Sequence, residues 1–441
     1  MKFLFIVVTF LCLTLFRPLL LFTYPILVFL FFLLLKLRLN KTVGLACLAI
    51  IVAGIISMII EGFFIYNLVF SLYLIITTLL FATAKPVQRD IFKDKAYFKS
   101  FIKIFSYFLV IVNISAAIYA VLVLATADYP EDVFTGLYGK GGFGSHSLSV
   151  INFLMATYYF FEKKYKNFAF FFVCGILGFY GQGLFIYVIA FGLVILPYLL
   201  KNVATTLKIV FIAVSFFSVV YLINPANFKY IRVNIAYAEL IFEEYDYKYE
   251  IEKMKEHRRT YIPRYITFLD GSRRLFFSDA KVFFLGTSPG TFNSRVAFYL
   301  NGDFIQNKTY KKLFNYQTEY HHDYVLPILN RKYLANTMWN DGTRNQPFSS
   351  LVSVLLEYGF IFGSIILFLF FSSIRRVRKA TTRKETSNFV KFIFYYCLIL
   401  FLFQYYLEVI EIVFPMLLMV KLIEVDLLNS QNKEDAPALE S

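Results

Sequence analysis

Long apolar runs recur along most of this 441-residue chain and restrict its fold more than any other feature. A lipid-spanning helix needs about 17 to 25 apolar residues. Residues 3–35 are therefore enough for two helices, with the natural break at Arg17 and Pro18. Further runs follow at 42–60, 63–84, 101–125, 148–161, 168–180, 184–200, 207–223, 351–374, 390–406 and 409–423. The sequence predicts an all-α polytopic membrane protein with about twelve transmembrane helices.

The composition excludes several other classes of protein. Hydrophobic residues make up 59% of the chain and charged residues only 17%, so the chain needs lipid as its solvent. The net charge of +15 does not predict a nucleic-acid partner, because much of the Lys and Arg lies in short clusters between apolar runs. All four cysteines lie inside apolar runs, so we expect neither a disulfide framework nor a spaced set of metal ligands. The sequence has no nucleotide-type phosphate-binding loop and no dinucleotide fingerprint, and we predict no cofactor.

The basic clusters also predict how the chain is oriented. Short cytoplasmic connections carry an excess of Lys and Arg. The clusters at 36–41, 85–103, 163–166, 201–208 and 375–391 all fall on one side of the membrane if the N-terminus is inside. Both termini are then predicted to be cytoplasmic.

The apolar runs and one long polar stretch divide the chain into four parts. Residues 1–223 form an N-terminal bundle of about nine helices, and residues 224–350 form a large, mostly helical extracytoplasmic loop. Residues 351–428 form about three C-terminal helices, and the polar residues 429–441 form a disordered cytoplasmic tail. We expect any chemistry at the outer face, where three segments stand out.

The first segment, residues 136–147, is rich in glycine. Gly139 and Gly144 permit tight turns and close approach of a ligand to backbone amides, and His146 is a candidate catalytic residue. The alternative is a flexible hairpin between two helices, with His146 as a polar group at a helix start.

The second segment, residues 270–292, carries adjacent arginines. Arg273 and Arg274 lie in an apolar context and suit bidentate recognition of a diphosphate, with Gly286 and Gly290 in the turn that follows. The alternative is a salt bridge from these arginines to Asp270 or Asp279.

The third segment, residues 340–363, contains Arg344 and Asn345 and then enters a helix. Pro347 fits a helix start, and Ser349 or Ser350 can cap it. Glu357 lies inside the apolar run, where a carboxylate is costly and therefore a functional candidate. The alternative is a structural pair between Glu357 and an arginine.

Asp270 and Asn345 are further site candidates in the second and third segments, and three other residues of the long loop complete the set. His321 and His322 are candidate bases, but adjacent histidines on a regular element diverge, so we predict no metal site here. Trp339 could stack on a sugar ring.

In their order along the chain, the second and third segments resemble the O-antigen polymerase and ligase superfamily. These are bacterial polytopic membrane enzymes with ten to fourteen helices and a large periplasmic loop late in the chain. The resemblance rests on Arg273, Phe277 and Ala280, then the glycine-rich turn 286–292, then Asn345 and Pro347, then Glu357 and Gly359. Gln346 and Pro347 stand where ligases and many polymerases carry a histidine, which favours the polymerase.

The resemblance implies a metal-independent glycosyltransferase of the bacterial inner membrane. It would transfer a growing glycan from undecaprenyl diphosphate to a new undecaprenyl-diphosphate-linked repeat of an O-antigen, capsule or exopolysaccharide. Arg273, Arg274 and Arg344 would stabilise the leaving diphosphate, and Glu357 would be the first candidate base, ahead of His146, His321 and His322. A chain-length regulator and a flippase would be its protein partners.

Two other functions stay open. A ligase would pass the finished polymer to lipid A core. A flippase or another transporter of lipid-linked oligosaccharide would share the helix count, but transporters place ionisable residues at mid-membrane, whereas this chain concentrates polar groups in one outer loop.

Overall fold

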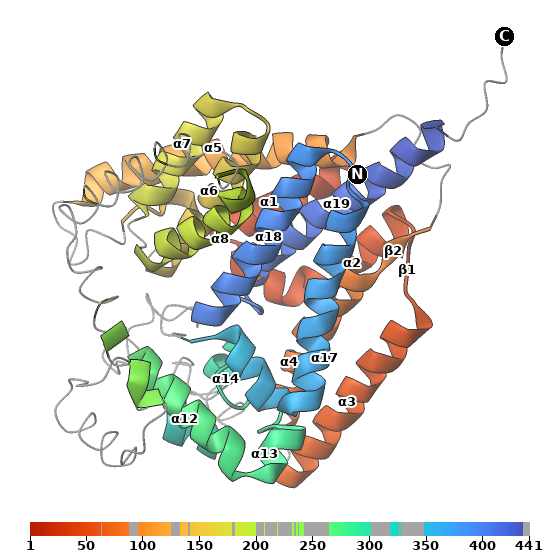
Figure 1. The fold of residues 1–441 in the computed structure, drawn as a ribbon, viewed down its shortest axis with the longest axis vertical. Coiled ribbons are helices and arrows are strands. Elements are labelled where there is room, and N and C mark those ends of the chain that lie inside the picture. Colours follow the sequence, from red (N-terminus) through yellow and green to blue (C-terminus); the bar gives the residue numbers. More distant parts are fainter. Residues whose placement is uncertain are drawn as a thin grey trace.

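The computed structural model covers residues 1–441 and is helical nearly throughout (Figure 1). It describes residues 1–62, 64–87, 96–124, 133–139, 142–178, 181–199, 238–241, 264–300, 318–325 and 348–434, with a few single positions between them. Two-residue strands, β1 (Leu37–Arg38) and β2 (Lys85–Pro86), are the only strands in these ranges.

The predicted apolar run 207–223 lies outside the described ranges. Each of the other predicted runs coincides with a helix. These helices are α1 (Lys2–Leu13), α2 (Leu20–Leu34), α3 (Lys41–Glu61), α4 (Ile65–Thr83), α5 (Tyr97–Val123), α6 (Gly142–Phe161), α7 (Tyr165–Leu177), α8 (Gly181–Leu199), α17 (Ser350–Ala380), α18 (Lys384–Phe403) and α19 (Ile410–Glu434). Six helical segments of the described chain are long and apolar enough to cross a membrane, and α1, α7 and α8 are shorter apolar helices. The described chain is therefore mostly helical, with six helices that could span a membrane, which is consistent with the predicted all-α membrane class. The number of twelve spans stays a prediction.

The predicted break within residues 3–35 is confirmed. A short 3-10 turn, η1 (Arg17–Leu19), separates α1 from α2. Proline fixes its own backbone angle and lacks an N–H, so it cannot continue a preceding helix but fits the start of the next one.

Several connections that carry lysine or arginine meet at one end of the bundle, here called the basic end. β1 pairs with β2 in antiparallel register, which joins the connection after α2 to the connection after α4. Arg383, before α18, forms an ion pair of 3.1 Å with Glu162, after α6. The structure thus joins the cluster at 36–41 to the start of the cluster at 85–103, and the cluster at 375–391 to the end of α6. Which side of a membrane these clusters face stays a prediction.

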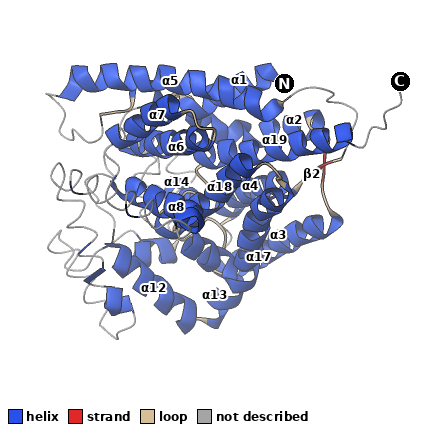
Figure 2. Cartoon of the chain, turned by 45° about the horizontal axis from the view of Figure 1, so that its top comes forward, coloured by secondary structure: helices blue, strands red, loops and turns tan. Residues whose placement is uncertain are grey.

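The opposite end, here called the loop end, carries the described part of the long loop (Figures 1 and 2). The loop contributes α12 (Arg264–Ser278), α13 (Ala280–Leu285), α14 (Arg295–Leu300) and the π-helical turn η6 (His321–Val325). α13 packs on α17 and α3, and α14 packs on α4. A second apolar core joins Phe268, Phe292 and Phe298 of the loop to Phe348 and Leu356 at the start of α17. The loop is therefore docked on the bundle.

Two predicted elements differ from the structure. The predicted helix 351–374 forms part of α17, but α17 is kinked at Gly359, which has φ 73° and ψ 168°. The predicted disordered tail from residue 429 starts too early, because α19 continues to Glu434. No proline or glycine interrupts 429–434, and Pro437 follows beyond the helix end.

Candidate functional site

A backbone loop at the loop end wraps around the buried carboxylate of Glu357. Its Oε2 accepts the amide N–H of Gly290 at 2.8 Å. Its Oε1 accepts the amides of Phe292 at 3.0 Å, Asn293 at 3.1 Å and Ser294 at 3.0 Å. Successive amides that converge on one anion form a nest, here closed by a side chain of the same protein. The partners of the Glu357 carboxylate are therefore backbone amides. Among the described residues no arginine pairs with Glu357, so the predicted alternative of a structural Glu–Arg pair is wrong there.

Two glycines allow the loop to approach Glu357 this closely. Gly286 has φ +80°, and a Cβ there would lie 2.4 Å from the carbonyl oxygen of Glu357. Gly359 has φ +73°, and its Cβ would lie 2.3 Å from the carbonyl oxygen of Phe284. The amide of Thr287 also donates to the carbonyl of Leu356 at 2.7 Å. The second and third sequence segments, about seventy residues apart, are therefore in direct backbone contact.

Polar side chains from the bundle hold the loop on its other faces. Asn67 of α4 donates through Nδ2 to the carbonyl of Gly290 at 2.6 Å, and Ser57 of α3 donates to the carbonyl of Gly286 at 3.3 Å. Asn293 in the loop donates to Ser353 Oγ of α17 at 2.8 Å. Three bundle helices therefore fix the position of this loop.

A buried ion pair continues the polar centre toward α19. Arg295 binds Glu411 through both terminal nitrogens, at 3.0 and 3.1 Å, and also donates to the carbonyl of Glu408 at 3.2 Å. The Glu408 carboxylate accepts the amide of Val296 at 3.3 Å and the hydroxyl of Ser71 at 3.3 Å. Burial raises the pKa of Glu408 to about 8.

The sequence reasoning missed these participants. Asn67 lies inside the apolar run 63–84. A polar side chain within such a run costs free energy, and this could have identified Asn67 as a functional candidate. Arg295 and Glu411 are separated by more than a hundred residues, and no local pattern connects them.

His321 lies against the same loop and is buried, while His322 is exposed. Nδ1 of His321 lies 2.7 Å from the carbonyl oxygen of Phe292, so Nδ1 carries the proton and donates. Burial lowers the pKa of His321 to about 4, against the opposing effect of that hydrogen bond. Nε2 is then the unprotonated nitrogen, and within the described residues it has no hydrogen-bond partner. His322 pairs with Asp323 at 2.9 Å.

Arg273 and Arg274 lie on α12 and share one carboxylate. Arg273 Nη2 is 3.2 Å and Arg274 Nε is 2.8 Å from the two oxygens of the fully buried Asp270. Their side chains remain 36% and 31% exposed, so each keeps surface for an anion. Asp279 instead caps α13 by accepting the amides of Lys281 and Val282. Of the two salt bridges considered as alternatives, the structure contains the one to Asp270.

An apolar crevice of about 170 Å³ opens beside Arg273. It lies between α12 and α17 and is lined by Leu269, Ser272, Arg273, Phe276, Val352, Leu355 and Leu356. The last of these directly precedes Glu357 in the chain. A guanidinium at the edge of an apolar crevice suits a ligand with an anionic group on a hydrocarbon chain.

The remaining predicted site residues divide into two groups. His146 lies in the first turns of α6, which packs mainly on α7, and Figures 1 and 2 both show α6 apart from α13. Trp339, Arg344 and Asn345 lie outside the described residues. In the ranges that the structure describes, no group of three or more metal-ligating side chains gathers.

The chain was also compared with known proteins. No protein-family model matches the sequence, and no curated protein or solved structure gives a significant match. The case for a function therefore depends on the residues and the geometry of this chain.

Proposed function

We propose that this protein is a membrane glycosyltransferase that polymerises oligosaccharide repeats carried on a polyprenyl diphosphate. The observation that carries the proposal is the placement of two partly exposed arginines, Arg273 and Arg274, on α12 of the docked loop, with Arg273 at the edge of an apolar crevice. The ordered contact between the glycine-rich turn and the Glu357–Gly359 segment supports it, since these segments also carry the resemblance to O-antigen polymerases.

In this proposal the arginines stabilise the diphosphate as it leaves. Negative charge grows on the leaving group in the transition state, and fixed guanidinium donors act on that charge most strongly. Asp270 holds both side chains by salt bridges, so little reorganisation is needed when the substrate arrives. The prenyl chain next to the diphosphate would lie along the apolar crevice.

The geometry changes the role that we propose for Glu357. Both of its oxygens accept backbone amides, so we assign it the positioning of the glycine-rich loop. His321 is the better candidate for the base, because its Nδ1 proton is bound to the Phe292 carbonyl and Nε2 keeps a lone pair for the attacking hydroxyl.

A transporter of the same lipid-linked substrate is the second candidate. It is favoured by the buried ion pair between Arg295 and Glu411. However, this pair lies where α14 and α19 begin, and the buried Lys421 contacts the carbonyl of Ala84 just after α4, at the other end of the bundle. These charges lie at the two ends of the bundle, whereas carriers typically place ionisable groups at mid-membrane.

The test uses purified protein in vesicles with a lipid-linked oligosaccharide repeat. Arg273→Ala is expected to lower polymer formation by about 100-fold or more, the effect of losing one transition-state donor. Lys281→Ala is the matched control, because Lys281 is also a half-exposed cation at the loop end but pairs with Glu61 at 2.6 Å. Its activity should stay near that of the wild type.

Two other outcomes contradict the polymerase, and a third contradicts only the site. Transfer of finished polymer to lipid A core, with no elongation of repeats, would establish a ligase. Movement of intact substrate across the vesicle membrane, with no glycan growth, would establish a transporter. Equal activity of wild type and Arg273→Ala would remove the arginines from the site.

A further inference from the structure

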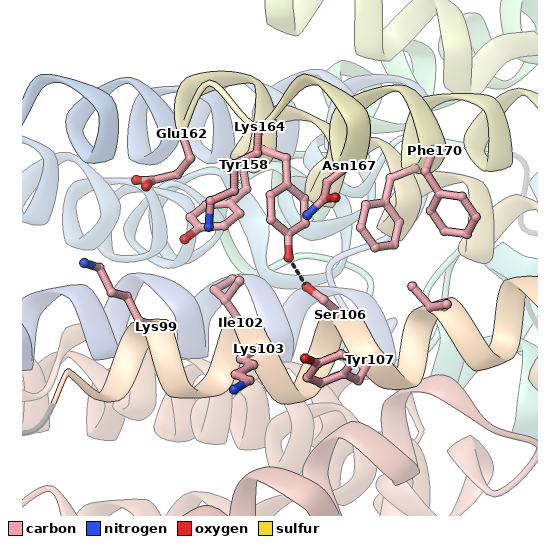
Figure 3. A pocket seen from close by; sticks show the side chains of 13 residues that line it. Lys99, Ile102, Lys103, Ser106, Tyr107, Tyr158, Glu162, Lys164, Asn167 and Phe170 are labelled. Atoms are coloured by element: carbon pink, nitrogen blue, oxygen red, sulfur yellow. Dashed lines mark hydrogen bonds between the residues drawn. The ribbon is translucent and has the colours of Figure 1, made fainter.

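A large cavity lies at the basic end, away from the candidate catalytic centre. It measures about 730 Å³ and separates one face of α5 from the end of α6 and the start of α7 (Figure 3). On α5 the lining residues Lys99, Ile102, Lys103 and Ser106 recur every three or four positions, as expected for one face of a helix. The cavity is thus a space between helices.

Two hydrogen bonds between α5 and α6 keep this space in shape. Ser106 and Tyr159, which both line the cavity, are joined by a hydrogen bond of 2.7 Å, the dashed line that starts at Ser106 in Figure 3. Further along α5, the amides of Asn113 and Asn152 bind each other reciprocally at 2.7 and 2.9 Å. The two helices are therefore fixed to each other independently of any ligand.

The charges around the cavity are mainly positive. Lys99 and Lys103 lie on α5, with Lys99 extending toward the opposite wall and Lys103 at the lower edge of the helix in Figure 3, and Lys164 lies just before α7 on the opposite wall. The acidic lining residue, Glu162, is already paired with Arg383 at 3.1 Å. Between these three lysines and any carboxylate of the described ranges, the structure forms no ion pair. A second cavity of about 610 Å³ shares Lys99 and Lys103 and adds Lys2, which extends the positive groove.

Beyond the lysines the walls become apolar and open to the outside of the bundle. Tyr107 is 63% exposed at the edge of the cavity, with Phe170 across from it. The exposed face of α5 then continues with Ile111, Ile114 and Ile118. In a membrane this face meets hydrocarbon chains, so the positive cavity and an acyl-chain surface are continuous.

We propose that this cavity binds the headgroup of an anionic glycerophospholipid. The phosphate lies among Lys99, Lys103 and Lys164, and an acyl chain runs past Tyr107 along the exposed face of α5. Basic pockets between membrane helices are suited to such headgroups. A lipid fits this site better than free phosphate, because only a lipid has an acyl chain that can contact the apolar half of the site. The site does not depend on the chemistry proposed at the loop end.

The test measures lipid binding to the full-length protein in detergent by native mass spectrometry. Wild type should retain phosphatidylglycerol over phosphatidylcholine, and the triple variant Lys99→Gln, Lys103→Gln, Lys164→Gln should lose this preference by about tenfold or more. The control replaces Lys41, Lys166 and Lys379 with Gln. These lysines are exposed near the basic end and do not line the cavity, so the preference should persist.

A second measurement needs no substitution. Photoreactive phosphatidylglycerol is expected to label peptides containing 99–110 and 158–171 of the wild-type chain. The proposal fails if label is found elsewhere, if both triple variants lose lipid equally, or if neither does. Competition by inorganic phosphate or glycerol phosphate at the same concentration as the lipid would show a site for free anions instead, and would overturn the lipid assignment.

Discussion

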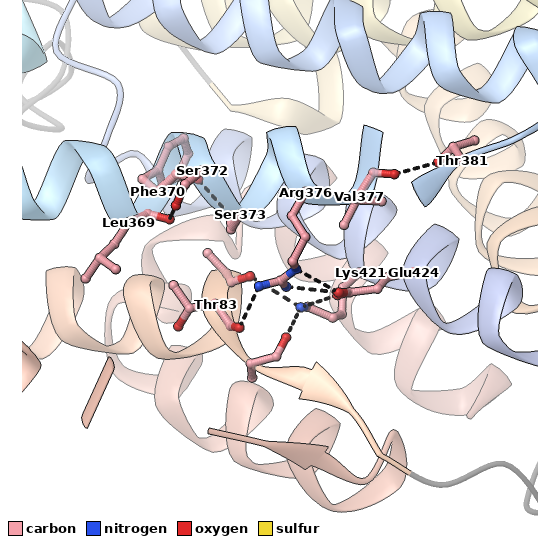
Figure 4. A network of polar contacts seen from close by, with 12 residues as sticks. Thr83, Leu369, Phe370, Ser372, Ser373, Arg376, Val377, Thr381, Lys421 and Glu424 are labelled. Carbon is pink, nitrogen blue, oxygen red and sulfur yellow. Dashed lines mark hydrogen bonds and ion pairs between the residues drawn. The ribbon is translucent and has the colours of Figure 1, made fainter. Parts of the chain in front are cut away.

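The two ends of this bundle bury charge in opposite ways. At the loop end, the anion Glu357 collects four backbone N–H groups from the loop 290–294. At the basic end, the cations Lys421 and Arg376 collect carbonyls at the end of α4 (Figure 4). Lys421 donates to Ala82 and Ala84, and Arg376 donates to Thr83 at 3.2 Å.

The sign of the buried charge at each end follows from the backbone groups that lack a hydrogen-bond partner there, which are carbonyls at the basic end and amides at the loop end. The last carbonyls of a helix have no intrahelical donor, so cations from α17 and α19 satisfy the end of α4. The loop end presents amides of an irregular loop instead, and these require an acceptor. Glu424 then balances the two cations, through contacts of 2.7 Å with Lys421 and 2.9 Å with Arg376. At each end a buried charge, Glu357 or Lys421, joins segments that are distant in sequence.

The largest expected effect is at Glu357. Glu357→Ala leaves four buried amides without their acceptor and should lower the free energy of unfolding by about 4 kcal/mol. Glu357→Gln should cost about half as much, because it keeps one carbonyl oxygen. Thermal unfolding in detergent measures both. Glu385→Ala, at the start of α18, removes one partly exposed ion pair with Arg383 and should cost much less than Glu357→Ala. A stable Glu357→Ala protein would contradict the anchoring role.

The glycine at the kink of α17 gives the next effect. Gly359→Ala places a Cβ 2.3 Å from the Phe284 carbonyl at φ +73°, so it should cost about 3 kcal/mol. Gly44→Ala in α3 is the matched control, since nothing lies within 4 Å of its Cβ. That change should be neutral or stabilise by up to about 1 kcal/mol. Equal unfolding temperatures for the two variants would show that the loop does not depend on this contact.

The comparison also predicts an effect at the basic end. Lys421→Met keeps the length of the side chain but removes the donors to Ala82 and Ala84, and should cost about 2 kcal/mol. The loss is smaller than at Glu357 because Arg376 continues to bind Thr83 and Glu424. Unfolding in detergent is compared with that of Lys379→Met, an exposed lysine. If Lys421→Met costs more than Glu357→Ala, the basic end is the more dependent on its buried charge.

Much of the fold could be predicted from the sequence, because helices that face lipid must be long and apolar. The break at Arg17 and Pro18 was also predictable, since proline ends a helix by local sterics. The kink at Gly359 was not. Its angles are imposed by α13, which packs directly on this glycine, and the contact joins residues far apart in the sequence.

The candidate site was predicted in part. The glycine-rich turn and Glu357 were both identified from the sequence, and the structure brings them together. Their relation was not predictable, because a carboxylate that binds amides carries no local signature that separates it from one that binds arginine. Arg295 and Glu411 were missed for the same reason, as each looks ordinary until its partner is known.

The last effect concerns pH, amounts to about 1 kcal/mol for each pH unit, and tests whether His321 belongs to the loop anchored by Glu357. Because burial lowers the pKa of His321 from 6.5 to about 4, the unfolded chain binds the proton first as the pH falls. The stability from the neutral ring is complete above pH 6.5 and is lost as the pH falls toward 4, by about 1 kcal/mol per pH unit. His321→Gln should remove that slope, whereas His322→Gln, with a 49% exposed side chain in the wild type, should retain it. Parallel curves for wild type and His321→Gln would mean that the ring does not stay buried, and would remove His321 from the candidate site.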